Sequence, residues 1–472
     1  MDRTHRLKTF SRSAWSRPSR ATWAAILLAL AATSSAQSDG YGFHEKHIER
    51  LTEAQKTAPV GVDGFGDQIS YFNGGLAFNN VDISLPGNNG LPVELRRSFA
   101  IEDRRELNNG PNPKGHFGGF AEWNLDIPHL SAMFKQGTGW QVSGSSPNQR
   151  CSNTHAPIDY YTFASYDYWN GYNLNVPGGG SEPLLRSPSA KLPAPTSGTY
   201  PWITRSLWRI SCKASTVNGY PGEAFLAVAP DGTKYHFDHV ITRTAPAVKY
   251  GGYPAGAPVY DILSRETVYF MVTKVEDRFG NYVTYSYVND ELRKIKGYNS
   301  AGVADGREIN LSWSNGRIST ATSSTGTWQY GYSSDNKLLS VTRPDSSQWT
   351  YARTGKLFLR TVDPDPLDDE FNDCPENSGA SGDSIVYAVK HPAGATATFT
   401  LHPRRHYRSN VVFNCVKPTP TYEYLQVPNY SDSFTLASKS ITGPGLTAMT
   451  WNYAYTGGHG LAWASACGTA LG

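Results

Sequence analysis

One sequence pattern recurs between residues 272 and 351, and it constrains the fold more than any other feature of the chain. Its clearest copy places a turn at Asp277–Gly280 and follows it with alternating tyrosines. Turn formers followed by alternating apolar residues are typical of β-hairpins. The positions taken as equivalent, which follow one another after 26, 19 and 19 residues, are Tyr285, Leu311, Tyr330 and Trp349.

Each hairpin presents one apolar face, and we expect these faces to form a shared core. The eight expected core residues of the repeat are Tyr285, Tyr287, Leu311, Trp313, Tyr330, Tyr332, Trp349 and Tyr351. A lone hairpin is marginal in water, so the copies must lie side by side. We therefore predict a mainly β fold in which repeated antiparallel hairpins form a long curved sheet, incomplete at the C-terminus. An ordinary β-sandwich is the alternative.

A second repeated feature is a pair of apolar residues three positions apart, followed by turn formers. The pairs are Val272/Val275, Leu292/Ile295, Leu338/Val341, Leu359/Val362 and Val386/Val389. They belong to the strands that lead into the turns.

Residues 1–36 have the features of a secretory signal. A basic stretch precedes an apolar run at residues 23–32, and small residues precede the expected cleavage after Ala36. An uncleaved anchor is the alternative. We expect bacterial export to the periplasm, the cell surface or the medium. No second long apolar run follows, so we expect no membrane span once the signal is removed.

The net charge of +3 comes from this signal. Residues 1–36 hold six basic residues and one acid, so the remainder of the chain carries a net charge of −2. Such a chain lacks the excess of basic residues that is typical of proteins that bind nucleic acid.

The chain is expected to have five segments: a signal peptide (1–36), a polar segment (37–60), a β-rich leader with loop insertions (61–255), the hairpin repeats (256–455) and a truncated tail (456–472). Within the leader we expect hairpins at residues 61–99 and Phe225–Phe237, and a long loop at Val176–Tyr200. The tail stops inside another β-like unit, which predicts that the sequence is the front part of a longer protein.

Five cysteines in an exported chain predict disulfides. The simplest arrangement pairs Cys151 with Cys212 and Cys374 with Cys415, because each pair would close a loop-rich insertion. Other pairings remain open. Cys467 is left over.

The repeat resembles the YD repeat of the RHS protein family. Asp277–Tyr287 is the best match and Leu338–Asp345 is a good one, while residues 61–99 resemble the leader of secreted bacterial members. The resemblance implies repeats that spiral into a hollow shell around a C-terminal toxin or effector domain. The implied partner is therefore a missing C-terminal shell and effector portion. A closing Asp-Pro-x-Gly-Leu motif is absent from the sequence, so the resemblance assigns self-cleavage to no residue.

No known catalytic, cofactor-binding or metal-binding motif occurs in the sequence. A nucleophile elbow, a phosphate-binding loop and metal-type cysteine spacing are all missing. His44/His47, His402/His406 and the acidic cluster Asp363–Glu376 are weak candidates for metal binding or catalysis. We therefore expect a non-enzymatic structural scaffold with no cofactor. The first alternative is a carbohydrate-binding module that uses the aromatic segment Asp159–Tyr172 to hold cell-surface glycans, and the second is a secreted hydrolase.

Overall fold

The computed structural model describes residues 64–87, 91–102, 118–140, 148–160, 163–178, 180–187, 198–252, 259–359, 380, 382–407 and 430–455. The chain divides into two compact units, Met1–Arg50 and Leu51–Gly472, and all described residues lie in the second. The described part is almost entirely β, as predicted, with one short helix, α3 (Ser165–Tyr168). None of its helices is long and apolar enough to cross a membrane.

Five strands form an N-terminal layer: β1 (Asp67–Ile69), β2 (Leu76–Leu85), β3 (Val93–Ile101), β4 (Gly119–Phe120) and β5 (Trp123–Leu125). A second group contains β6 (His129–Lys135), β7 (Tyr172–Val176), β8 (Gly180–Pro183), β9 (Leu185–Arg186), β10 (Trp202–Ile203), β11 (Arg209–Lys213) and β12 (Ala224–Val228).

The remaining strands include the predicted repeats. They are β13 (Lys234–Gly252), β14 (Val259–Glu276), β15 (Tyr282–Val288), β16 (Glu291–Tyr298), β17 (Ala304–Ser314), β18 (Arg317–Ser323), β19 (Gly326–Tyr332), β20 (Leu338–Thr342), β21 (Gln348–Thr354), β22 (Ile385–Lys390), β23 (Thr396–Tyr407), β24 (Tyr430–Gly443) and β25 (Leu446–Asn452).

The 25 strands of the described residues belong to one long sheet, which is not closed. From β9 to β25, each strand pairs antiparallel with the next. The sheet branches at β14, where Arg265–Met271 pairs with β6 and Lys274–Glu276 pairs with β15. Strand β6 continues into β7 and β8.

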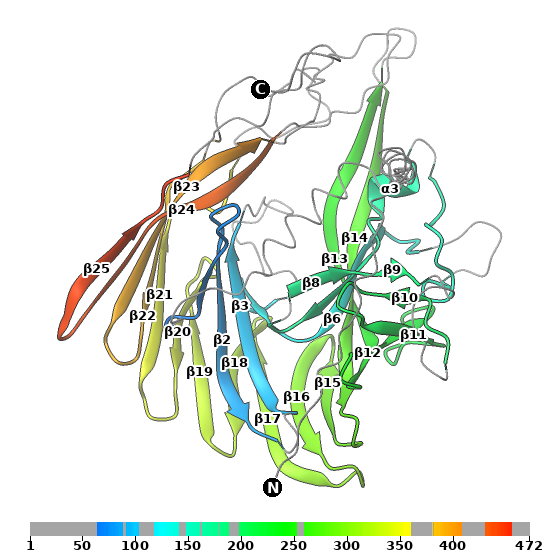
Figure 1. The fold of residues 1–472 in the computed structure, drawn as a ribbon, viewed down its shortest axis with the longest axis horizontal. Helices are drawn as coiled ribbons and strands as arrows, with labels where there is room; N and C mark the ends of the chain where they lie inside the picture. The colour runs from blue at the N-terminus through cyan, green and yellow to red at the C-terminus, as the bar shows by residue number, and fades with distance from the viewer. Residues whose placement is uncertain are drawn as a thin grey trace, which may run out of the picture. The chain divides into compact units, whose positions relative to one another are not determined.

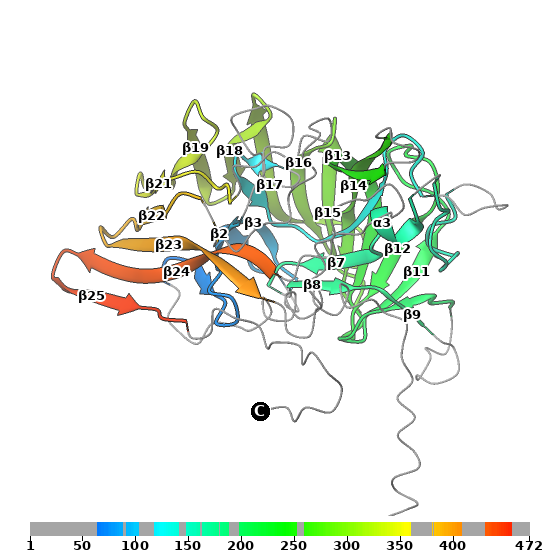
Figure 2. The same ribbon diagram turned by 90° about the horizontal axis from the view of Figure 1, so that it is seen from above.

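The N-terminal layer packs on one face of the repeat strands. Its order is β1–β2–β3–β5–β4, and one parallel bridge, Gly119 to Arg317, joins β4 to β18. Figure 1 and Figure 2 show β2 and β3 against the row of strands that runs from β16 to β24. The prediction of a hairpin near residues 61–99 is confirmed by the β2–β3 pair.

Two large hydrophobic cores and one small cluster (Phe163, Tyr168 and Leu263) lie among the described residues. The first lies between the N-terminal layer and the repeats, and its buried aromatic residues include Phe78, Phe99, Trp123, Tyr387 and Phe399. The second lies among β6, β7 and β10 to β14, and includes Phe134, Tyr172, Trp202, Phe225 and Phe270. Burying each such ring contributes roughly 1.5–3 kcal/mol.

Three of the five predicted apolar pairs, Val272/Val275, Leu292/Ile295 and Leu338/Val341, are explained by β-bulges. The pair Val386/Val389 is a wrong prediction, because β22 pairs without a bulge and its two valines face opposite sides, while Val362 lies outside the described residues. Successive side chains of a strand alternate between faces, so positions i and i+3 share a face only if one extra residue intervenes. The pairing of β15 with β16 skips Arg293, the pairing of β17 with β18 skips Ser319, and that of β19 with β20 skips Leu339. The buried pairs at these bulges are Leu292/Ile295, Ile318/Ala321 and Leu338/Val341.

A five-residue turn also recurs along the described chain. The first residue donates its N–H to the carbonyl of the fifth, the fourth donates to the carbonyl of the first, and the fourth has a positive φ. These turns begin at Ala229, Asp277, Asn299, Ser333, Arg343 and His391. The turn at Ala229 joins β12 to β13 and confirms the predicted hairpin at Phe225–Phe237.

The strand register corrects two expectations. Tyr330 pairs with Val341 on the strand that follows it, and Tyr351 pairs in the same way with Val389 on the strand that follows β21. Trp349 instead pairs back to Val341 on the strand that precedes it. The residue equivalent to Tyr330 is therefore Tyr351 and not Trp349. The last repeat step is therefore 21 residues. The predicted loop at Val176–Tyr200 contains strands β8 and β9, because its polar sequence pairs along β7 and β10.

Candidate functional site

The eight expected repeat-core residues all lie in the first hydrophobic core. Leu311, Tyr330 and Tyr351 are buried, and the other five pack against the cluster as partly buried side chains. The four positions first taken as equivalent lie on β15, β17, β19 and β21, every second strand of one sheet.

A buried arginine joins the N-terminal layer to these repeats. The Arg97 side chain on β3 is fully buried, and its Nε lies 2.9 Å from Asp82 Oδ2. Its Nη2 donates a 2.6 Å hydrogen bond to the hydroxyl of Tyr351 on β21, and its guanidinium lies 4.5 Å from the Trp123 ring centroid. Tyr330 on β19 donates to Asp82 Oδ2 at 3.0 Å. We call Asp82, Arg97, Tyr330 and Tyr351 the arginine contact.

The electrostatics of the arginine contact hold its ion pair in place. Burial opposes the charge of Arg97, but Asp82 and Tyr351 outweigh it and raise the pKa of the guanidinium. Burial raises the pKa of Tyr351 to about 12. The group therefore contains a fixed cation and two neutral phenols at ordinary pH. Removing either member of a fully buried pair is strongly destabilising, because the other charge is then left buried without a partner. The pair offers no exposed reactive atom.

A second ion pair crosses the same layers. Arg353 Nη2 on β21 lies 3.0 Å from Glu122 Oε2 in the turn before β5, and both side chains are almost fully buried. Arg353 occupies the position equivalent to the aromatic residue Tyr332 in the preceding repeat, since each lies two residues after Tyr351 or Tyr330. The repeat that contains Tyr351 therefore has an ion pair between the layers at the position where the preceding repeat has an aromatic ring.

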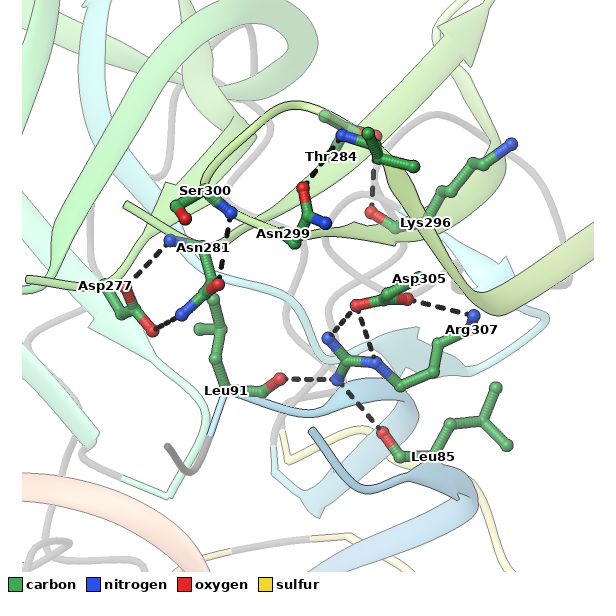
Figure 3. A network of polar contacts seen from close by, with 11 residues as sticks. Leu85, Leu91, Asp277, Asn281, Thr284, Lys296, Asn299, Ser300, Asp305 and Arg307 are labelled. Carbon is green, nitrogen blue, oxygen red and sulfur yellow. Dashed lines mark hydrogen bonds and ion pairs between the residues drawn. The ribbon is translucent and has the colours of Figure 1, made fainter. Parts of the chain in front are cut away.

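Figure 3 shows a third contact, at the far end of the β2–β3 hairpin. Arg307 at the start of β17 donates through Nη1 to the carbonyl oxygens of Leu91 (2.7 Å) and Leu85 (3.4 Å). Asp305 orients the guanidinium, accepting from Nε at 3.0 Å. A Cβ at Gly87 would lie 2.1 Å from Arg307 Nη1, so this approach requires glycine.

The neighbouring Asp277 explains the aspartate of the repeat. Its Oδ1 accepts from the backbone N–H groups of Phe279 (2.8 Å) and Asn281 (2.9 Å). Its Oδ2 accepts from Asn281 Nδ2 at 2.8 Å, and Asn281 Oδ1 accepts from the N–H of Ser300 in the next turn (Figure 3). The aspartate therefore fixes its own turn, and Asn281 links that turn to its neighbour.

A polar cluster of a different kind lies where β11, β13 and β14 meet. The pairing of β13 with β14 skips both Asp238 and Thr273, so each strand has a bulge at the same place. The two extra residues meet there, and Thr273 Oγ1 donates to Asp238 Oδ1 at 2.5 Å. Lys213 Nζ contacts the other oxygen, Oδ2, and lies 3.3 Å from His236 Nδ1. We call Lys213, His236, Asp238 and Thr273 the Asp238 cluster.

Burial distinguishes the members of the Asp238 cluster. The Asp238 side chain is only 2% exposed, whereas that of Lys213 is 30% exposed. Burial, and then the charge of Lys213, lower the pKa of His236, so this imidazole is neutral at neutral pH. The cluster thus combines a buried carboxylate, an amine, a hydroxyl donor and a neutral base.

The disulfide pairing predicted for the leader is present. Cys151 and Cys212 are joined, with 5.5 Å between their Cα atoms. The bond connects β11 to the segment before α3, in the second core. Cys374, Cys415 and Cys467 lie outside the described residues, as do Ala36, His44/His47 and Asp363–Glu376.

The aromatic segment proposed for glycan binding mostly faces inward. Phe163, Tyr168 and Tyr172 are buried, while Tyr166 is 76% exposed. Tyr168 and Tyr172 donate their hydroxyls to the backbone carbonyls of Ile158 and Arg150. These side chains bond to the backbone of the same region. The geometry gives no support to glycan binding.

Sequence candidates for metal or hydrolase chemistry are not assembled into a site in the described residues. No group of three or more histidine, cysteine, aspartate or glutamate side chains there could hold a metal ion. Ser384 Oγ lies 2.8 Å from His402 Nδ1 across β22 and β23, on an exposed surface. A triad also requires an acid that orients the histidine, and none bonds His402 in the described part of the chain. His406 instead contacts Thr435.

The arginine contact and the Asp238 cluster are absent from the sequence-based expectations, and only the arginine contact has a sequence signal. Arg97 occupies an inward position of the alternating strand Val93–Ile101, on the same face as Leu95 and Phe99. A charged residue on such an apolar face indicates a buried partner. Asp82 and Asp238 are both extra residues at bulges, which alternation alone does not reveal.

Comparisons with known proteins find no matching family model and no matching curated protein. The N-terminal domain of effector protein SpvB from Salmonella typhimurium strain LT2 aligns at 11% identity with a TM-score of 0.24, covering 79% of this chain and 100% of that domain. TcdB2-TccC3 without its hypervariable C-terminal region aligns at 11% identity with a TM-score of 0.18, covering 81% of this chain and 20% of that one. At these TM-scores neither alignment establishes a shared fold or family.

Proposed function

We propose that the chain is an exported, non-catalytic structural scaffold. The observation that supports this function most directly is the arginine contact. Its polar groups are sealed between two layers, and they bond to one another across β2, β3, β19 and β21. Side chains arranged in this way stabilise a wall rather than bind a substrate.

The proposal also has a more specific form: the scaffold is the N-terminal portion of an RHS-type β shell that encloses a C-terminal toxin or effector domain. Its support is the YD-like repeat together with the turns and bulges that recur from one hairpin to the next. Repeats that reuse one local geometry are suited to building an extended wall.

Enclosure can be tested by limited proteolysis of the chain expressed together with the reading frame that follows Gly472. We expect the downstream polypeptide to resist cleavage while the scaffold is intact. Arg97→Met, which loosens the N-terminal layer, should expose it at a protease dose that leaves the wild type uncut. The matched control is Arg96→Met, since Arg96 forms partly exposed pairs with Glu94 and Asp126 instead of a fully buried one.

Two results would count against the proposal. A downstream polypeptide digested equally in all three proteins would rule out enclosure but leave the scaffold. Hydrolysis of a glycan, ester or peptide substrate by the purified wild-type chain, lost in Ser384→Ala, would reject the non-catalytic scaffold itself.

A further inference from the structure

The Asp238 cluster has a chemistry that a structural wall does not by itself require. We propose that Lys213 and Asp238 form an intramolecular isopeptide cross-link, an amide between Lys213 Nζ and Asp238 Cγ that joins β11 to β13. This inference goes beyond the proposed function and does not depend on it, because it concerns a covalent modification within the leader.

The fold brings the two reacting groups together before any reaction. Lys213 is the last residue of β11, and Asp238 lies 25 residues later at a bulge of β13, with β12 between the two strands. Asp238 and His236 lie two positions apart on β13, so alternation places both on the face that contacts Lys213. An amine held against a carboxyl group reacts as an intramolecular pair, which replaces a bimolecular encounter by an effective molarity of roughly 10⁵–10⁸ M.

The other two members of the cluster supply the assistance that amide formation needs. Thr273 Oγ1 donates to Asp238 Oδ1, where it polarises the carbonyl and stabilises the negative charge that develops on attack. His236 Nδ1 lies 3.3 Å from Lys213 Nζ. In the tautomer protonated on Nε2, this nitrogen accepts a proton from the attacking amine.

The reaction balances without an oxidant, a reductant or a co-substrate. A proton passes from the Lys213 ammonium to Asp238 Oδ2, which gives a neutral amine and a carboxylic acid. Nζ then attacks Cγ, and His236 takes the proton that the new C–N bond displaces. The Cγ–Oδ2 bond breaks, His236 returns its proton to the leaving hydroxyl, and one water molecule departs.

A second buried lysine–aspartate pair provides an internal comparison. Lys439 Nζ contacts Asp67 Oδ2 with side chains 12% and 4% exposed, so it is at least as buried as Lys213 with Asp238. However, no described residue donates a hydrogen bond to Asp67 Oδ1, and no described histidine contacts Lys439 Nζ. We therefore expect Lys439 and Asp67 to remain an ion pair.

Mass spectrometry of the purified exported chain tests the proposal. After reduction of the disulfide, the intact mass should be one water molecule below the mass calculated for the linear chain. Proteolytic digestion should give one branched peptide that contains Lys213 and Asp238. Lys213→Arg keeps the charge and the contact but removes the acylable amine, so it should restore the full mass.

Three further variants separate the roles of the residues. Thr273→Val and His236→Phe should lower the fraction of cross-linked protein, because each removes one catalytic contact. Lys234→Met removes the exposed ion pair with Glu276 on the same strands and should leave the water loss unchanged. A wild-type chain of full mass with Lys213 in a linear peptide would overturn the proposal. A branched peptide at Lys439 and Asp67 instead would show that Thr273 and His236 have no part in such a reaction.

Discussion

The hydroxyl of Tyr332 donates a 2.6 Å hydrogen bond to the carbonyl oxygen of Ile318 on the preceding strand. Ile318 directly precedes the extra residue of its bulge, which is the point where ladder pairing is interrupted. The same bond occurs in two earlier repeats, where Tyr287 donates to Val272 (2.8 Å) and the indole N–H of Trp313 donates to Leu292 (2.7 Å). We call these three aromatic residues the bulge-capping residues.

The bulge-capping bond should be measurable in Tyr332→Phe. The variant keeps the ring in the core but leaves the Ile318 carbonyl without this donor. We expect a loss of about 1–3 kcal/mol in the free energy of unfolding, measured by urea denaturation. Tyr298→Phe is the control, since its ring stacks on Tyr282 at 4.8 Å on the other face of the sheet. Equal effects of the two substitutions would show that the hydroxyl of Tyr332 does not cap the bulge.

The sequence predicts the existence of the repeats better than their alignment. The buried pair Leu292/Ile295 breaks strand alternation, and that irregularity is itself the signal of a bulge. The 19-residue spacing of two aromatic residues aligns Trp349 with Tyr330, yet the strand pairing aligns Tyr351 with Tyr330. Spacing alone cannot fix register when the connecting turns and bulges differ by one or two residues.

The contacts between the layers were beyond sequence reasoning for a different physical reason. Arg97 and Tyr351 are 254 positions apart, and their hydrogen bond exists only because the N-terminal layer packs on the repeats. No local propensity encodes such a pairing. The single local indication is that Arg97 shares a strand face with Leu95 and Phe99.

Removal of the charge of Arg97 should destabilise the protein strongly. Arg97→Met leaves Asp82 buried without its cation, so we expect a loss of about 3–5 kcal/mol in the free energy of unfolding. Arg96→Met should cost less than Arg97→Met, because the pairs that Arg96 forms with Glu94 and Asp126 are both partly exposed. Chemical denaturation of both variants provides the measurement.

The double variant Arg97→Met/Asp82→Leu distinguishes the ion pair from simple packing. We expect it to be more stable than Arg97→Met, since it removes the orphaned carboxylate as well. A double variant that loses the full sum of the two single losses would contradict this account of the arginine contact.

Gly87→Ala should loosen the end of the β2–β3 hairpin. The new Cβ would lie 2.1 Å from Arg307 Nη1 and 2.3 Å from the Leu91 carbonyl oxygen, so Arg307 must withdraw. We expect faster amide hydrogen exchange in β2 and β3 and a loss of about 1–3 kcal/mol from the broken hydrogen bonds. Gly64→Ala is the control, because its Cβ would meet no atom of the described residues within 4 Å. Unchanged exchange in Gly87→Ala would mean that Arg307 does not hold this end.

Glu308 should make the stability of the protein depend on pH in the acid range, and salt should weaken this dependence. Hydrogen bonds from Lys294, and then from Asn310 and Lys296, lower its pKa from 4.5 to about 2. A carboxylate with a depressed folded-state pKa contributes stability above pH 4.5, and this contribution is lost as the pH falls from 4.5 towards 2. The Glu308 side chain is partly exposed, so we expect its ion pairs to contribute less than about 1 kcal/mol, reduced further by salt.

Melting temperatures of the wild type and Glu308→Gln measure this contribution. The wild type should melt higher at neutral pH and low salt, and the two curves should converge through the acid window. A difference that stayed constant down to pH 2 would assign the effect of Glu308 to packing instead of charge.

Strand β25 should make the protein associate through its edge. Its residues Leu446–Asn452 are all exposed and carry no charge, and no described strand pairs with its outer edge. Natural sheet edges usually carry lysine, proline or a bulge that prevents pairing with another chain. We therefore expect association that increases with concentration, measured by sedimentation velocity, and Met449→Lys should suppress it.

The matched control for this edge is Leu339→Lys. Leu339 is 42% exposed and Met449 is 41% exposed, but Leu339 lies on β20, which pairs on both sides with β19 and β21. Both variants thus exchange an exposed apolar side chain for a lysine, and only one of them changes a free edge. If Leu339→Lys suppressed association as strongly as Met449→Lys, general surface hydrophobicity would be responsible, and the unpaired ladder of β25 would have no special role.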